Sequence, residues 1–307
     1  MISTVLMTIM LLGLFALMAT AALAPLETLS WWAGWTEEEL GETPPAPSSE
    51  ARPALRYIVY LSGVASISGR YLLPREKAFI RLLRKRLPGD VLVSNVFPYS
   101  PQGLPLLEAP RLFEQVWRRA QLFKLTDRQT FLSVLINLRN IFQVMVSADH
   151  RYGPIFNQGA ASVIEAALDK AGYPRGSGAA VTIIGYSGGA QVAAGAAAFL
   201  TVRLRAPIDV ISIGGVLASD PGLGYVRKFH HLIGDRDNVQ RIGAAVFPER
   251  WPLIATSEWN AGKRDGRISA HVLPGVTHAG VNGYFGRPLI DGMSNAQRTA
   301  ETIGGLL

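Results

Sequence analysis

Residues 181–191 read Val-Thr-Ile-Ile-Gly-Tyr-Ser-Gly-Gly-Ala-Gln, and this stretch decides the predicted fold. The apolar run predicts a buried strand, and the small residues after Ser187 predict a helix that packs closely on a sheet. Between them lies Gly-x-Ser-x-Gly, with Ser187 at its centre. A strand, a sharp turn and a helix around this motif hold a serine out as a nucleophile, and the two outer glycines keep side chains from separating the helix from the strand.

A serine hydroxyl needs a base within hydrogen-bond reach, and the base needs a group that orients it. His278 follows an apolar segment in Leu-Pro-Gly-Val-Thr-His-Ala-Gly, where a loop at a strand end would carry it. His271 lies inside the preceding predicted strand, where a packed or surface histidine is more common. We therefore predict His278 as the base, and we interpret His230 and His231 as ordinary strand residues.

The orienting carboxylate is expected between Ser187 and His278. Residues 229–239, Phe-His-His-Leu-Ile-Gly-Asp-Arg-Asp-Asn-Val, predict a strand that ends in a glycine turn with two acids. Asp237 is the preferred candidate, because it lies on the loop where a carboxylate reaches an imidazole Nδ1–H. Asp235 and Asp220 are the alternatives: the first could cap a turn or pair with Arg236, and the second could cap the turn before Pro221.

A tetrahedral oxyanion requires hydrogen-bond donors that are already aimed at it. The backbone N–H of Gly188, directly after the serine, is one expected donor. The second is expected from the loop after the first central strand, Ser-Gly-Val-Ala-Ser at 62–66, through the amide of Gly63 or Val64. The alternative is that this loop is a plain strand-to-helix turn.

Strand and helix patterns alternate through most of the chain, which predicts an α/β fold with a mostly parallel central sheet and helices on both faces. Strands are expected at 56–61, 90–97, 180–186, 208–213, 228–233 and 268–273, and helices at 74–87 and 294–307.

The alternation stops between residues 99 and 150. Two helices are predicted there, at 111–124 and 127–147, and the second carries apolar residues at helical spacing. This stripe is interpreted either as a core-covering face or as a helical cap insertion that gives the site an apolar pocket for an acyl chain.

Together these features resemble the α/β-hydrolase superfamily over residues 54–307. The resemblance rests on Gly185-Tyr186-Ser187-Gly188-Gly189, on the Gly234-x-x-Asp237 strand end and on the late His278, in the order Ser, Asp, His. It implies a serine hydrolase, of the esterase or lipase kind, that acts on esters, thioesters, amides or related acyl bonds. No His-Gly-Gly-Gly run follows the first strand, so the oxyanion loop is of another type. The chain also resembles uncharacterised membrane-anchored bacterial members, which imply no substrate.

The N-terminus differs from the rest of the chain. Residues 1–24 are uncharged and apolar, and as a helix they are long enough to span a hydrocarbon core of roughly 30 Å. Three tryptophans follow at 31, 32 and 35, suited to a membrane interface. We predict a membrane anchor over 1–35, with a cleaved signal peptide as the alternative. An acidic, proline-rich linker is expected at 36–53, and the membrane side stays open.

Composition narrows the function classes. The chain has no cysteine, and its five histidines show no metal-ligand spacing, so we expect no disulfide, no metal and no cofactor. The net charge is +7, but no basic–aromatic platform for nucleic acid is present. We expect a membrane-tethered serine hydrolase of an apolar or lipid-like acyl substrate. An acyltransferase and a non-catalytic scaffold are the alternatives, and the oligomeric state is undetermined.

Overall fold

The computed structural model describes residues 15, 18–19, 56–69, 72–100, 131–290 and 292–307. The predicted linker, the helix expected at 111–124 and nearly all of the predicted anchor lie outside these residues. Within the described part of the chain, no helix is long and apolar enough to cross a membrane.

A six-stranded parallel sheet forms the centre of the fold, in the order β2-β1-β3-β4-β5-β6. Its central strands are almost continuous runs of buried Val, Ile and Leu, as expected for a sheet covered on both faces. The strands are β1 (Tyr57–Leu61), β2 (Val91–Val96), β3 (Val181–Tyr186), β4 (Ile208–Ile213), β5 (Val226–Gly234) and β6 (Ile268–Leu273). A small antiparallel pair, β7 (Leu289–Ile290) and β8 (Met293–Ser294), lies outside this sheet.

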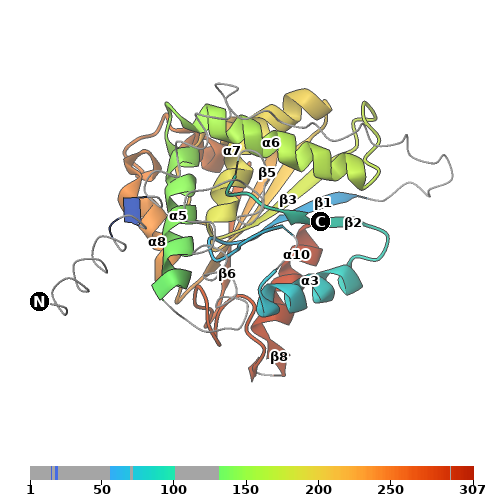
Figure 1. Ribbon diagram of the computed structural model, residues 1–307, viewed down its shortest axis with the longest axis vertical. Helices are drawn as coiled ribbons and strands as arrows, with labels where there is room; N and C mark the ends of the chain where they lie inside the picture. The colour runs from blue at the N-terminus through green and yellow to red at the C-terminus, as the bar shows by residue number, and fades with distance from the viewer. Residues whose placement is uncertain (1–14, 16–17, 20–55, 70–71, 101–130, 291) are drawn as a thin grey trace, which may run out of the picture.

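Helices cover both faces of the sheet (Figure 1). One face packs against α6, α7 and α9 through one buried cluster, and the opposite face packs against α3 and α10 through a second. The helices are α3 (Pro74–Arg86), α5 (Phe131–Ala148), α6 (Gly153–Lys170), α7 (Gly188–Leu204), α8 (Asn238–Val246), α9 (Glu258–Arg264) and α10 (Asn295–Leu306), with short 3₁₀ turns η1 (Pro221–Tyr225) and η2 (Pro248–Arg250).

The strand order reverses between β1 and β3. The chain leaves β1 through α3 toward β2 on one side, and it leaves β3 through α7 toward β4 on the other. In open parallel sheets, ligands bind at the carboxyl ends of the strands where the order reverses. Leu61 pairs with Gly185, so the loop after β1 and the turn that carries Ser187 lie next to each other at this point.

The strands and helices expected from sequence agree with the described elements to within about two residues at most ends, and the α/β fold with a parallel sheet is confirmed. The apolar stripe of α5 divides between two environments. Leu135, Ile136 and Val144 pack into a small cluster with residues of the segments that follow β1 and β2, whereas Ile141 and Met145 are exposed.

Candidate active site

Ser187 occupies a strained turn between β3 and α7. Its φ is 53° and its ψ is −123°, a conformation that costs a non-glycine residue on the order of 1–3 kcal/mol. A Cβ on Gly185 would overlap the backbone of Ala190, and a Cβ on Gly189 would lie 2.6 Å from the carbonyl oxygen of Ser62. The two flanking glycines therefore allow α7 to start against the sheet, as the sequence predicted.

His278 lies between Ser187 and Asp237. Its Nε2 is 2.9 Å from the Ser187 Oγ, and its Nδ1 is 2.9 Å from the Asp237 Oδ2. The serine follows β3, the aspartate follows β5 and the histidine follows β6, so three strand ends bring these residues together. The Asp237 side chain is fully buried, whereas the His278 side chain keeps 16% of its surface exposed.

Asp237 is fixed by hydrogen bonds on both carboxylate oxygens. Its Oδ1 caps α8 by accepting from the backbone N–H groups of Val239 and Gln240, at 2.9 and 3.1 Å. Its Oδ2 accepts from the Tyr284 hydroxyl at 2.8 Å, in addition to facing His278. Burial alone would raise the pKa of Asp237, but His278 and these donors outweigh it and lower the pKa below its usual value. The carboxylate is thus ionised at neutral pH.

The alternative acids and the alternative base lie elsewhere. Asp235 accepts from the backbone N–H of Gly275 at 2.7 Å, and Asp220 bonds to Gln191 and Gly222. His271 lies on β6, where its Nε2 is 3.2 Å from the Nδ1 of His230. Of the three candidate aspartates, Asp237 is the one hydrogen-bonded to His278.

Two tyrosines that sequence reasoning did not single out hold the histidine loop. The Tyr186 hydroxyl donates to the carbonyl oxygen of His278 at 2.8 Å, and its ring stacks on the imidazole with centroids 5.6 Å apart. The Tyr284 hydroxyl accepts from the Gly234 N–H at 2.7 Å while it donates to Asp237. Burial raises the pKa of both tyrosines well above the usual range, so both remain hydrogen-bond donors. Tyr186 occupies the first variable position of Gly-x-Ser-x-Gly, directly before Ser187, and this position was the sequence signal that could have identified it.

The loop after β1 contains both amides that were expected as oxyanion donors, and the structure distinguishes between them. The N–H of Gly63 donates to the Glu76 Oε1 at 3.3 Å, and the Tyr60 hydroxyl donates to the same oxygen at 2.9 Å. In the part of the chain that the structure describes, the N–H groups of Val64 and Gly188 have no hydrogen-bond acceptor. The Val64 side chain would meet a Cβ on Gly188 at 2.8 Å, so the two residues are in close proximity.

Helix α5 fixes this loop through buried polar side chains. The Asn140 Nδ2 donates to the carbonyl oxygens of Val64 and Ser66, at 2.7 and 2.8 Å. Arg139, which is also buried, donates to the carbonyl oxygen of Tyr99 and to the Asn140 Oδ1. The apolar side chain of Val144 lies against Gly188. Nothing in the sequence around Asn140 indicated this role, because its partners are more than 70 positions away.

The arrangement suits proton transfer and nucleophilic attack at one serine. A histidine is in contact with the hydroxyl, an ionised carboxylate holds the histidine, and two backbone amides lie nearby. Among the described residues, no group of three or more His, Asp or Glu side chains is placed to hold a metal ion.

Comparison with known proteins assigns no family to the chain. No protein-family model matches it, and no curated protein sequence matches it either.

Proposed function

We propose that this protein is a serine hydrolase of the α/β-hydrolase superfamily, with Ser187, His278 and Asp237 as its catalytic triad. The observation that carries the proposal is the continuous hydrogen bonding from the Ser187 Oγ through both ring nitrogens of His278 to Asp237, on a strained turn at the end of a central strand. Similar geometry on unrelated folds supports acyl transfer to a serine.

In the proposed reaction, the Ser187 Oγ attacks the carbonyl carbon of an ester while its proton moves to the His278 Nε2. Asp237 holds the imidazolium that forms, through Nδ1–H. The N–H groups of Gly188 and Val64 would donate to the oxyanion, since that of Gly63 already donates to Glu76. The alcohol leaves with the proton from His278, and a water molecule then releases the acyl group from Ser187 by the same steps.

We propose an apolar or lipid-like acyl substrate. Helix α8 starts directly after Asp237, and α5 contacts Gly188, so both helices border the site. Both carry exposed apolar side chains, which are Val134, Ile141 and Met145 on α5 and Val239, Ile242 and Val246 on α8. An apolar surface of this kind favours a hydrophobic ligand or a lipid surface. The predicted N-terminal membrane anchor would keep the site near such substrates.

The test is covalent labelling of the full-length protein with a fluorophosphonate probe. Wild type should be labelled and Ser187→Ala should not, because the probe reacts with an activated serine. The matched control is Ser212→Ala, which removes a second histidine-bonded serine and should leave labelling at the wild-type level. Equal labelling of wild type and Ser187→Ala would refute the proposal. A panel of esters of increasing acyl length then measures the apolar preference.

A further inference from the structure

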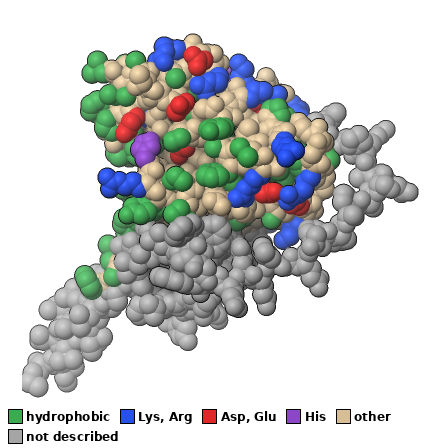
Figure 2. Space-filling view, turned by 90° about the horizontal axis from the view of Figure 1, so that it is seen from above, with side chains coloured by type: hydrophobic (Ala, Val, Ile, Leu, Met, Phe, Trp, Pro, Cys, Tyr) green, Lys and Arg blue, Asp and Glu red, His purple; other side chains and the backbone are tan. Residues whose placement is uncertain are grey.

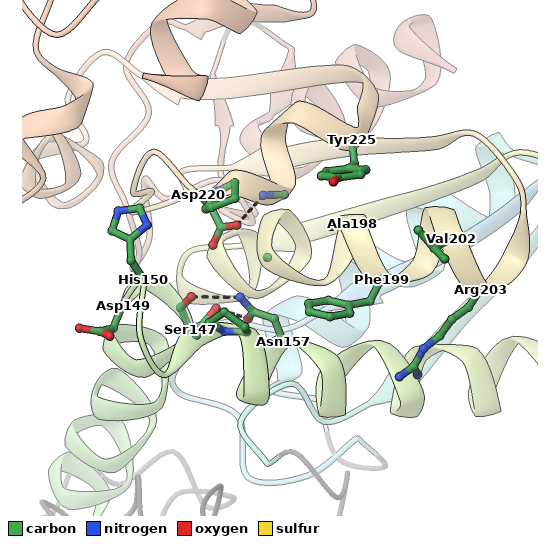
Figure 3. A pocket seen from close by; sticks show the side chains of 16 residues that line it. Ser147, Asp149, His150, Asn157, Ala198, Phe199, Val202, Arg203, Asp220 and Tyr225 are labelled. Carbon is green, nitrogen blue, oxygen red and sulfur yellow. Dashed lines mark hydrogen bonds between the residues drawn. The ribbon is translucent and has the colours of Figure 1, made fainter. Parts of the chain in front are cut away.

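A cavity of about 390 Å³ lies between α6, α7 and η1, and none of Ser187, His278 and Asp237 lines it. Its two ends differ in chemistry (Figure 3). Polar side chains gather at one end, namely Ser147, Asp149, His150, Asn157 and Asp220. Apolar side chains form the other end, namely Ala198, Phe199, Val202 and Tyr225. The cavity therefore fits an amphiphilic molecule better than a uniformly polar or apolar one.

Asp220 is a buried carboxylate without a cation. It is 5% exposed, and its oxygens accept from two neutral donors, the Gln191 Nε2 at 2.9 Å and the Gly222 N–H at 2.7 Å. No Lys, Arg or His of the described ranges forms an ion pair with it. Buried charges in proteins are generally paired, because an unpaired one loses its hydration without compensation.

The pKa of Asp220 reflects its burial without an ion-pair partner. Burial raises its pKa to about 6, although the Gly222 amide, the Gln191 amide and His150 each favour the ionised form. At neutral pH the group is therefore mainly ionised but poorly stabilised. A cation that entered the cavity would supply the missing partner.

The opposite orientation, with an anionic head at the far end, is disfavoured by the contacts of Arg203. Its guanidinium donates to the Ser162 Oγ at 2.6 Å and to the Glu165 Oε2 at 3.5 Å. The positive charge at that end is thus already paired. Seen from above, hydrophobic side chains run across the middle of the surface, and Lys and Arg side chains lie around its edges, including beside the exposed histidine (Figure 2).

We propose that this cavity binds a cationic amphiphile, a primary alkylammonium, with its ammonium group on Asp220 and its alkyl chain along α7 against Phe199 and Val202. Burial of the alkyl chain should raise the affinity roughly fourfold per added methylene group. The site is separate from the proposed catalytic residues and needs none of them.

The test is calorimetric titration of the full-length protein with n-hexylammonium, n-hexanol and n-hexanoate. Hexylammonium should bind roughly tenfold or more tightly than either analogue, since its ammonium group can make a charge-assisted hydrogen bond with Asp220 that neither analogue can make. Asp220→Asn should weaken hexylammonium binding by a similar factor. The matched control, Asp265→Asn, removes an exposed carboxylate on another helix end and should leave the affinity unchanged.

A second variant keeps the test decisive if Asp220→Asn fails to fold. Ala198→Phe retains the carboxylate but fills the apolar end, and it should abolish the gain in affinity from butylammonium to hexylammonium. Equal affinities for hexylammonium and hexanoate, unchanged binding in both variants, or no measurable binding by wild type would each overturn the proposal.

Discussion

Several serine–histidine hydrogen bonds lie on this sheet, and two of them, those of Ser187 and Ser212, have almost the same length. The Ser187 Oγ is 2.9 Å from the His278 Nε2, and the Ser212 Oγ is 3.0 Å from the His231 Nδ1. The second pair arises from strand register, because Ser212 on β4 and His231 on β5 are direct neighbours in the parallel ladder. A hydrogen bond between serine and histidine is therefore a contact that a sheet can produce without any catalytic purpose.

The surroundings separate the two pairs. Ser212 and His231 are both fully buried in regular strands, and burial lowers the pKa of His231 to about 3, so its imidazole stays neutral. Among the described residues, no carboxylate hydrogen-bonds this histidine. Ser187 instead lies on a strained turn beyond its strand, beside two amides with no acceptor, and its histidine is held by Asp237. Position at the strand ends, rather than the pair itself, distinguishes the proposed active site.

The largest effect is expected from removing the two histidines in turn. On the proposed mechanism, His278→Gln should lower ester hydrolysis by roughly 10⁴- to 10⁶-fold, because Ser187 loses its base. His231→Gln should change kcat/KM by only a few-fold, since its imidazole takes part in no proton transfer. Comparable losses in both variants, measured on the best ester of the panel, would abolish the distinction between the pairs.

The next largest effect concerns the carboxylate that only one pair possesses. Asp237→Asn should lower kcat by about 10⁴-fold, because the amide no longer selects the productive tautomer of His278 or stabilises its charged form. Asparagine caps helices as well as aspartate, so α8 should remain folded.

Asp235→Asn is the matched control for this change, two positions away on the same loop. Its carboxylate bonds to the Gly275 amide and not to His278, so its kcat should stay within a few-fold of wild type. If Asp235→Asn lost all activity while Asp237→Asn kept it, Asp235 rather than Asp237 would be the residue that orients His278.

The strands and the turn at Ser187 can be predicted from the sequence, whereas the long-range contacts that support the site cannot. The strands are predictable because buried parallel strands are continuous apolar runs, and the turn at Ser187 is predictable because Gly185 and Gly189 are needed wherever a helix starts so close to a strand. These are properties of residues that are neighbours along the chain, so the sequence alone predicts them.

The supporting contacts depend on the folded sheet. Three aspartates follow strand ends, and the fold directs Asp237 toward His278. The Asp237 side chain passes close to Gly214, where an added Cβ would lie 2.9 Å from the Asp237 Oδ2. Tyr284 and Asn140 act across 47 and 76 positions, in segments without a motif. Such pairs leave no signal in one sequence, because tertiary packing rather than spacing brings them together.

The smallest effect is expected from the outermost support of the carboxylate. Tyr284→Phe removes the hydroxyl that donates to Asp237 and leaves the Gly234 N–H without its acceptor, which should cost about 1–3 kcal/mol of unfolding free energy at pH 7. Hydrolysis should fall by roughly tenfold, because Asp237 still holds His278 but is less well fixed.

The pH dependence gives this variant a signature that lost packing would not produce. The folded pKa of Asp237 lies below its unfolded value, so its ionised form stabilises the protein fully above the unfolded pKa, and this contribution is lost as the pH falls through the folded pKa. Without the Tyr284 hydroxyl the folded pKa rises toward the unfolded value, so this contribution is smaller and its loss is complete at a higher pH. The difference in unfolding free energy between wild type and Tyr284→Phe should therefore narrow as the pH falls. Urea unfolding of wild type and Tyr284→Phe between about pH 3 and 7 measures this. An equal destabilisation at every pH would mean that Tyr284 supports the loop but does not stabilise the charge on Asp237. The Tyr284–Asp237 hydrogen bond would then no longer count among the interactions that distinguish the site from the buried Ser212–His231 pair.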